Sequence, residues 1–199
     1  MMKFKKNNLN GTLVRLEPLS MKHKDGLIET VLDGELWKSF VTTIPSVAEM
    51  DIFIANAEKE YKNSFGISYA IIDKKSNKVV GSTRFIYTDF LNKSTEIGYT
   101  FLAKSRQRSY VNTESKLLLL TYAFEKMNFN RIEMFTDFLN HNSRKAIVRL
   151  GLKQEGILRN HLIMPNGRIR DSILFSIIAN EWLGVKESLL FKLNYKELN

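Results

Sequence analysis

Three positive charges fall within five residues of a short polar segment, at Lys104, Arg106 and Arg108. Before this segment, residues 95–102 are β-branched, aromatic and aliphatic, which predicts a largely buried strand. After it, the chain is expected to be helical from Thr113, and a helix with a polar first turn presents unpaired backbone N–H groups. Together these features predict a binding site for an anion such as a phosphate. The same charges would also fit an ordinary solvated loop.

The composition excludes several classes of protein. Hydrophobic residues make up 44% of the 199-residue chain and charged residues 26%, as in ordinary globular proteins. No apolar run approaches the roughly 20 residues of a membrane span, and the basic start lacks the apolar stretch of a secretory signal. The chain has no cysteine, and its three histidines lack metal-ligand spacing. We therefore expect a cytoplasmic protein that binds no metal ion.

The net charge of +9 favours a polyanionic partner. Nucleic acid, the ribosome, anionic lipid and a phosphate-rich cofactor are all candidates on charge alone. Basic residues alternate with acidic ones over residues 49–60 and 114–126, and no helix concentrates Lys and Arg on one face. This pattern argues against a surface built to bind nucleic acid.

Hydrophobic periodicity predicts one domain of the α+β class. Apolar residues repeat at every second position in the predicted strands and at every third or fourth position in the predicted helices. Capping and turn residues mark where these elements begin and end. Gly81, inside one of the strands, suggests a bulge or a close backbone approach. The single helix between two central strands allows them to be parallel, so we expect a mixed, mostly antiparallel sheet of about seven strands with one central parallel βαβ junction and helices on both faces. The predicted strands are 11–19, 65–73, 78–87, 95–102, 131–137, 154–164 and 168–179, and the predicted helices are 20–33, 46–63, 113–127, 140–150 and 181–195.

Several linked segments resemble a known family. In order and spacing they are similar to the GNAT superfamily of N-acetyltransferases, in its RimJ/RimL-like branch. The likeness covers about residues 11–182, so we predict a single N-acetyltransferase domain over residues 1–199 with a helical extension at 183–199, acting as a monomer or homodimer. The segments are Gly11 to Leu16, Glu35 to Trp37, Glu96 to Tyr99, Gln107 to Glu114, Asn140 to Ser143 leading into Leu150-Gly151, and Met164 to Asp171.

One loop departs from the usual family pattern. The superfamily loop commonly reads Gln/Arg-x-x-Gly-x-Gly/Ala, and its glycines let backbone amides approach the cofactor pyrophosphate. Here Ser105, Arg108 and Tyr110 occupy the corresponding places, as in a sub-branch that reads Gln-Arg-x-x-Val-Asn-Thr-Glu. We expect the amides to reach the phosphates if φ stays negative, because side chains disfavour a positive φ.

The resemblance implies transfer of an acetyl group from acetyl-CoA directly to an amine. The pyrophosphate would lie on the N–H groups of residues 108–113, at the positive end of the helix dipole. Backbone groups of Phe101 and Leu102 would pair with the pantetheine arm, and Asn140 resembles the family asparagine that hydrogen-bonds it. The predicted cofactor-binding residues are Phe101, Leu102, Arg106, Gln107, Arg108, Ser109, Tyr110, Val111, Asn112, Thr113, Asn140 and Ser143.

Glu96 and Ser143 are the predicted catalytic residues. Glu96 would accept the amine proton through water, and Ser143 stands where this branch places the hydroxyl that protonates the departing CoA thiolate. Each residue also has a plainer interpretation. Glu96 would fit an ion-paired carboxylate near a strand end, Ser143 a first-turn helix serine, and Asn140 a helix cap that is compatible with pantetheine binding.

The amine acceptor is expected to enter beside the first two helices, the 34–45 loop and the late hairpin. Trp37, Phe40, Tyr87 and His161 are predicted to line this side, although each would also fit simple packing. Reference pKa values are about 8 for an α-amine and about 10.4 for lysine, so a carboxylate base handles an α-amine more readily. This favours a protein N-terminus as acceptor. The alternatives are a small-molecule amine and a non-catalytic basic module that binds ribosome or RNA.

Overall fold

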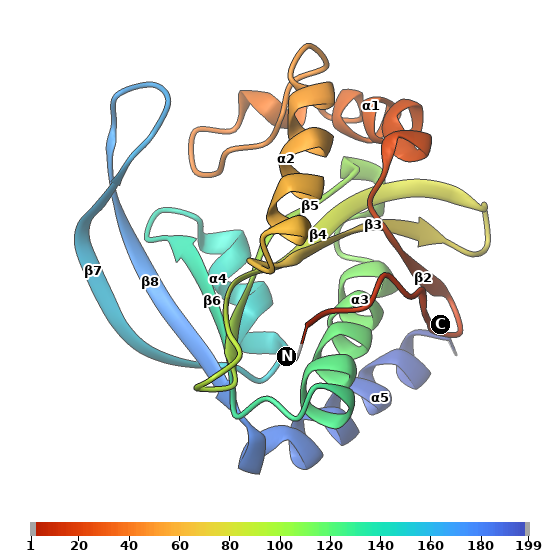
Figure 1. Ribbon diagram of the computed structural model, residues 1–199, viewed down its shortest axis with the longest axis vertical. Coiled ribbons are helices and arrows are strands. Elements are labelled where there is room, and N and C mark those ends of the chain that lie inside the picture. The colour runs from red at the N-terminus through yellow and green to blue at the C-terminus, as the bar shows by residue number, and fades with distance from the viewer. Residues whose placement is uncertain (1–2, 198–199) are drawn as a thin grey trace.

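The computed structural model describes residues 3–197, and the side chains of residues 3–194 (Figure 1). The strands are β1 Leu9–Asn10, β2 Val14–Pro18, β3 Ile67–Asp73, β4 Lys78–Asp89, β5 Ser94–Leu102, β6 Arg131–Asp137, β7 Lys153–Ile163 and β8 Ile169–Ile178. The main helices are α1 Lys24–Leu32, α2 Met50–Lys62, α3 Tyr110–Thr121, α4 His141–Arg149 and α5 Trp182–Glu197. The predicted order of strands and helices is confirmed, with β1 as an added strand.

The strands form one eight-stranded sheet in the order β1-β2-β3-β4-β5-β6-β8-β7. Neighbouring strands are antiparallel except β5 and β6, which are parallel. The predicted α+β class, with one central parallel junction, is therefore confirmed. The prediction of about seven strands misses β1, because two residues are too few to show an alternating pattern.

The sheet has helices and a hydrophobic core on each face. Figure 1 shows α1 and α2 covering one face and α3 with α5 covering the other. Successive residues of β3 point to opposite faces, so Ala70 and Ile72 pack with α1 and α2, whereas Tyr69 and Ile71 pack with α3 and α5. The strand is buried along its whole length because both of its faces are covered.

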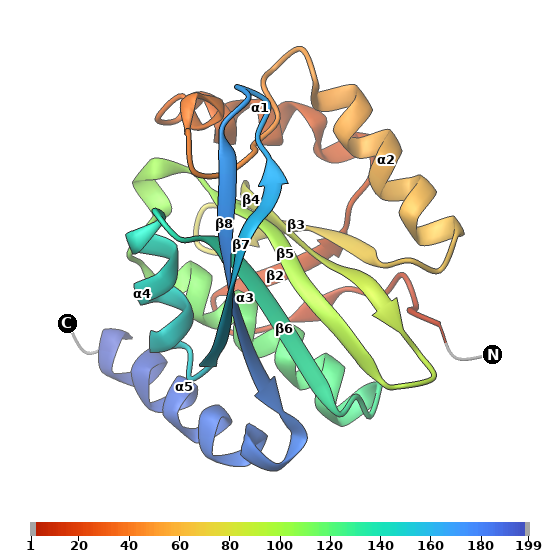
Figure 2. The same cartoon turned by 90° about the vertical axis from the view of Figure 1, so that its left-hand side faces the viewer.

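The parallel strands β5 and β6 begin together and then separate (Figure 2). They pair only through residues 94–96 of β5 and 131–133 of β6. Helix α3 follows β5 and α4 follows β6, so the N-termini of both helices lie toward the end where the strands are apart. The backbone N–H and C=O groups that follow Glu96 in β5 and Glu133 in β6 therefore form no ladder hydrogen bonds between these two strands.

Two helices begin at positions other than those predicted. Helix α3 begins at Tyr110 rather than Thr113, because Ser109 provides its N-cap. Helix α2 begins at Met50 rather than Ser46. The backbone N and the Oγ of Ser46 do donate to Glu49, each at 2.8 Å, but this interaction closes a turn in front of the helix.

Gly81 combines the two features that were predicted for it. The pairing of β3 with β4 shifts register there, as in a β-bulge. A Cβ added to Gly81 would lie 2.3 Å from the Phe101 carbonyl oxygen of β5, which is far inside contact distance. Only glycine therefore allows β4 and β5 to approach this closely.

Helix α5 docks on the body of the domain through its buried side chains Trp182, Leu189 and Leu193. The Trp182 ring stacks on Phe124 at 5.5 Å between centroids. Within residues 3–197, no helix is long and apolar enough to cross a membrane.

Candidate active site

The loop between β5 and α3 has a positive backbone φ, which usually requires glycine, although the loop contains no glycine. Arg108 has φ of +60°, in the left-handed region that side chains disfavour. The condition of a negative φ, on which amide access to the phosphates was predicted, is therefore not met at Arg108, whereas Ser105 and Tyr110 are helical. The Ser109 hydroxyl explains how this turn is held, because it donates to the Arg106 carbonyl at 2.6 Å and accepts from Val111 N at 3.3 Å. Strained backbone persists where surrounding contacts define it in this way.

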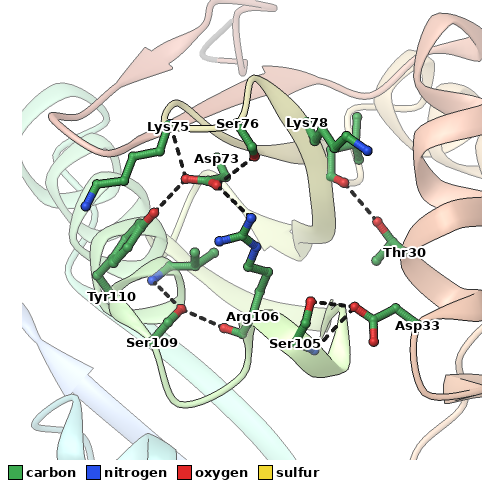
Figure 3. Close-up of polar contacts among 12 residues, drawn as sticks. Thr30, Asp33, Asp73, Lys75, Ser76, Lys78, Ser105, Arg106, Ser109 and Tyr110 are labelled. Carbon is green, nitrogen blue, oxygen red and sulfur yellow. Dashed lines mark hydrogen bonds and ion pairs between the residues drawn. The ribbon is translucent and has the colours of Figure 1, made fainter.

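Asp73, the last residue of β3, holds the same loop through its side chain (Figure 3). The carboxylate is fully buried and accepts hydrogen bonds from Tyr110 Oη and Ser76 Oγ, both at 2.7 Å, and Arg106 Nη2 lies 3.3 Å from its Oδ2. Burial alone would raise the pKa of Asp73, but these hydrogen bonds and the Arg106 charge bring it below its ordinary value. The Arg106 guanidinium, which was predicted to contact phosphate, is thus engaged by Asp73.

The beginning of the loop is anchored as well. Ser105 donates its backbone N and its Oγ to Asp33 Oδ2, at 3.3 and 2.5 Å, as Figure 3 shows. Gln107 Nε2 donates to the Leu102 carbonyl at 3.2 Å. The basic segment is therefore an ordered turn with several anchors, and the plain solvated-loop interpretation does not describe it.

The first turn of α3 presents backbone amides at the opening between β5 and β6. Val111 and Thr113 have fully buried side chains, and the Val111 N–H donates to the Ser109 cap. Neither side chain is therefore available to a ligand. Thr113 Oγ1 accepts a hydrogen bond from Arg149 Nη2 at 3.0 Å, which links α3 to α4. The N–H groups at the start of a helix have no partners within the helix, and the dipole there favours an anion.

Phe101 and Leu102 differ in what their backbones offer. Both side chains are buried, in the cores on opposite faces of the sheet. The Phe101 carbonyl oxygen lies against Gly81 of β4, on the side of β5 that is away from β6. The Leu102 carbonyl already accepts from Gln107.

Glu96 lies at the last paired position before β5 and β6 separate, and its partner there is Glu133. Burial and the negative charge of Glu133 raise the pKa of Glu96 to about 7, against the opposing charge of Arg170. A carboxyl group with such a pKa exchanges a proton readily near neutral pH, as a general base must. Arg170 is the positive charge that acts on Glu96, and its effect on the pKa of Glu96 is smaller than that of Glu133.

Asn140 and Ser143 are brought together at the start of α4. Asn140 is the N-cap, and its Oδ1 accepts from Ser143 N at 3.0 Å, which confirms the helix-cap interpretation. The turn before it depends on Asp137, whose buried carboxylate accepts from Leu139 N at 2.9 Å. Arg168, in the turn between β7 and β8, forms an ion pair with Asp137.

The four aromatic residues predicted to line the acceptor side have different surroundings. Trp37 packs into the core beside α1 and α2. The Phe40 side chain is exposed, and its carbonyl accepts from Arg168 Nη2 at 2.9 Å. Tyr87 is exposed overall. Partial desolvation of its hydroxyl raises its pKa, and the neighbouring Tyr99 and Glu96 act in the same direction. His161 stacks on Phe135 at 5.8 Å between ring centroids.

Sequence reasoning missed Asp73, Glu133 and Tyr99 as parts of this region. Tyr99 has φ of +50° and lies in a bulge of β5. No turn residue in the sequence indicates that bulge. Asp73 was predicted only as the end of a strand, and Glu133 only as part of the strand 131–137. In the structure, Arg131 Nε donates to Glu133 at 2.8 Å. Among the residues that the structure describes, no group of three or more His, Cys, Asp and Glu is placed to hold a metal ion.

Comparison with known proteins agrees with this fold. A family model described as an acetyltransferase (GNAT) domain matches residues 14–153. YdaF of Bacillus subtilis (strain 168), whose name proposes a ribosomal N-acetyltransferase, is 29% identical over 187 residues, covering 91% of this chain and 98% of YdaF. A GCN5-related N-acetyltransferase from Brucella melitensis superposes with a TM-score of 0.85 at 30% identity, covering 96% of this chain and 87% of that one. RimJ of Mycobacterium smegmatis, solved with a CoA-disulfide, shares the fold with a TM-score of 0.78 at 21% identity, covering 90% of this chain and 88% of RimJ.

A mixed sheet whose central parallel strands separate beside a capped helix N-terminus defines an acyltransferase of the N-acetyltransferase class. The chain belongs to the GNAT family. The predicted resemblance to the RimJ/RimL-like branch is also confirmed, by the likeness to YdaF over nearly its whole length and by the fold shared with RimJ.

Proposed function

We propose that this protein transfers the acetyl group of acetyl-CoA directly to a primary amine, and that the preferred acceptor is the α-amine of a protein N-terminus. The observation that carries the proposal is the position of Glu96. It lies where β5 and β6 separate, on the strand that leads straight to the anchored loop and the first turn of α3. The proposed base therefore lies at one end of the part of β5 that is not paired with β6, and the proposed anion-binding helix N-terminus lies at its other end.

The residues present fit acetyl-CoA. The pyrophosphate would lie on the first-turn amides of α3, beside Arg108 and the basic turn, and the pantetheine would follow β5 toward Glu96. RimJ, which shares this fold, was solved with a CoA-disulfide. Arg106 supports this site indirectly, because its ion pair with Asp73 holds the loop in place.

The proposed chemistry is a single displacement. The amine nitrogen attacks the thioester carbonyl carbon, so a C–N bond forms and the C–S bond breaks. Glu96 accepts the proton that the amine loses, directly or through one water molecule. The departing thiolate takes a proton from the Ser143 hydroxyl, which regains one from solvent. The backbone N of Ser143 donates to the Asn140 cap, and this contact fixes Ser143 at the start of α4.

An α-amine suits this site better than a lysine amine. A base of pKa about 7 is matched to an α-amine of pKa about 8, whereas a lysine side chain near 10.4 requires roughly 3 kcal/mol more for deprotonation. The name of YdaF, which proposes ribosomal N-acetyltransferase activity, points to the same kind of acceptor. Because nascent and ribosomal protein N-termini are found in the cytoplasm, we place the reaction there.

Two measurements test the proposal. Isothermal titration with acetyl-CoA should show binding in the micromolar range, and an absence of heat at millimolar cofactor would overturn it. An acetyl-transfer screen should then compare peptides that have free α-amines with the same peptides blocked at the N-terminus, and with polyamines and aminoglycosides. Transfer to the free peptides alone is the expected result, and preferential transfer to a small amine would replace the protein acceptor.

A further inference from the structure

The bulge in β5 lies where the proposed reaction requires the thioester. In the pairing of β4 with β5, Ser82 faces Phe101 and Arg84 faces Gly98, so Tyr99 and Thr100 together lie opposite the single residue Thr83. Tyr99 takes the left-handed conformation, with φ of +50°. The bulge begins three residues after Glu96, roughly 10 Å along a strand, and it lies between that base and the anchored loop.

A lysine of α3 holds this bulge from one face of the sheet. Lys116 Nζ donates to Thr100 Oγ1 at 2.6 Å and to Thr83 Oγ1 at 3.0 Å, and the two threonine hydroxyls are 2.8 Å apart. The three side chains close a triangle across the bulge. Because Lys116 belongs to the helix whose first turn faces the pyrophosphate, the same residue connects the cofactor helix to the strand.

A second cation holds the bulge from the opposite face. The Arg84 guanidinium lies 4.3 Å from the centroid of the Tyr99 ring and 4.9 Å from that of Phe53 in α2. Arg84 Nη1 donates to both carboxylate oxygens of Glu60, at 3.0 and 2.7 Å. The bulge is therefore held on both faces of the sheet, by Arg84 at Tyr99 and by Lys116 at Thr100, as a strained backbone requires.

The buried Lys116 amine lowers the stability of the fold. Its side chain is 3% exposed, its hydrogen-bond partners are neutral hydroxyls, and burial lowers its pKa to about 7. A buried amine without a carboxylate partner destabilises a core, and an apolar side chain of the same length would fill the space without that penalty. Such a residue is expected where its contribution is to the site rather than to stability.

We propose that Lys116 is a positioning residue for acetyl transfer. It holds the Tyr99–Thr100 bulge in the shape that receives the thioester and couples that shape to the cofactor helix. The inference rests on the proposed function, since it assigns the bulge to the acetyl group of acetyl-CoA.

The test compares Lys116→Met, Thr100→Val and Thr100→Ser with wild type. Lys126→Met changes an exposed lysine in the π-helical turn Tyr122–Lys126, which directly follows α3, and is the matched control. Lys116→Met and Thr100→Val should each lower kcat roughly tenfold, because a loosened bulge holds the thioester less well in its reactive position, with the Kd for acetyl-CoA within twofold of wild type. Thr100→Ser should restore most of the rate because it keeps the hydroxyl.

Stability separates positioning from a purely structural role. Lys116→Met should unfold at the same temperature as wild type or higher at pH 7, although it is slower in catalysis. A kcat within twofold of wild type would overturn the proposal, and so would a slower variant that has lost stability and cofactor affinity in proportion.

Amide hydrogen exchange keeps the test independent of activity. If wild type neither binds acetyl-CoA nor transfers acetyl groups, the proposed function fails, and exchange still reports on the bulge. Amides of residues 99–102 should exchange faster in Lys116→Met and Thr100→Val than in wild type and Lys126→Met. Equal exchange in all four proteins would show that Lys116 does not hold the bulge.

Discussion

Glu96 and Glu133 face each other across β5 and β6 at the last residue pair before these parallel strands separate. Two carboxyl groups at such a position cannot both be charged without cost, and the one that is more buried takes up the proton more readily. Arg131 Nε donates to Glu133 at 2.8 Å, whereas Glu96 experiences both burial and the negative charge of Glu133. Glu96 is therefore the member of the pair whose pKa rises, to about 7.

The pH dependence of the reaction tests Glu96 as the base. Because the deprotonated carboxylate is the active form, kcat/KM should rise as pH increases through about 7 and level off above it. Glu96→Gln should lower kcat by roughly a hundredfold or more and remove this step from the profile. Steady-state rates from pH 5 to 9 provide the measurement. A profile unchanged in Glu96→Gln would exclude the residue from the mechanism.

Glu133 should tune Glu96 without taking part in proton transfer. In Glu133→Gln the neighbouring negative charge is gone, so the step in the pH profile should move below 7, toward the ordinary value of a glutamate. The rate at high pH should change little. Glu58→Gln, a glutamate on α2 that pairs with Lys6, serves as the control and should leave the step in place. An unshifted step in Glu133→Gln would contradict the coupling.

Asp73 should control cofactor affinity through the loop. Asp73→Asn removes the ion pair with Arg106 and weakens the hydrogen bond from Tyr110, so the turn before α3 loses two of its anchors. We expect the Kd for acetyl-CoA to rise about tenfold with a small effect on kcat at saturation. Calorimetry measures the change. Asp51→Asn, which removes an exposed ion pair with Lys24, should bind like wild type.

Arg108 offers a direct test of the left-handed turn. Arg108→Gly and Arg108→Ala both delete the side chain, but only glycine adopts φ near +60° without strain. The glycine variant should therefore be more stable than the alanine variant by about 1 kcal/mol in denaturant unfolding. If the backbone amides carry most of the pyrophosphate binding, both variants should bind acetyl-CoA. Equal stability of the two variants would mean that this turn relaxes in solution.

Gly81 should be intolerant of any side chain. A Cβ at this position meets the Phe101 carbonyl oxygen, so Gly81→Ala must push β4 away from β5 next to the bulge. We expect a loss of about 1–3 kcal/mol in the free energy of unfolding, together with slower acetyl transfer. Gly156→Ala is the matched control, because its added Cβ meets no atom within 4 Å. Loss of comparable size in both variants would point to glycine flexibility rather than to strand contact.

Much of the fold could be predicted from local sequence patterns. The spacing of apolar residues, the cap at Asn140 and the turn at residues 165–167 act over a few neighbouring residues, so they could be recognised in the sequence. The order of strands and helices, the parallel junction and the two faces of the sheet followed from them. Boundaries such as the start of α2 did not, because a turn and a helix can share the same capping residues.

The site depended on contacts between residues far apart in the chain. The sequence alone determined that a basic turn precedes a buried helix and that a glutamate begins the strand before it. Only the tertiary structure placed Asp73 against Arg106, Glu133 beside Glu96 and Lys116 beneath the bulge at Thr100. Burial and neighbouring groups shift the pKa values of Asp73 and Glu96, and burial shifts that of Lys116. These causes are properties of the assembled fold rather than of residue type.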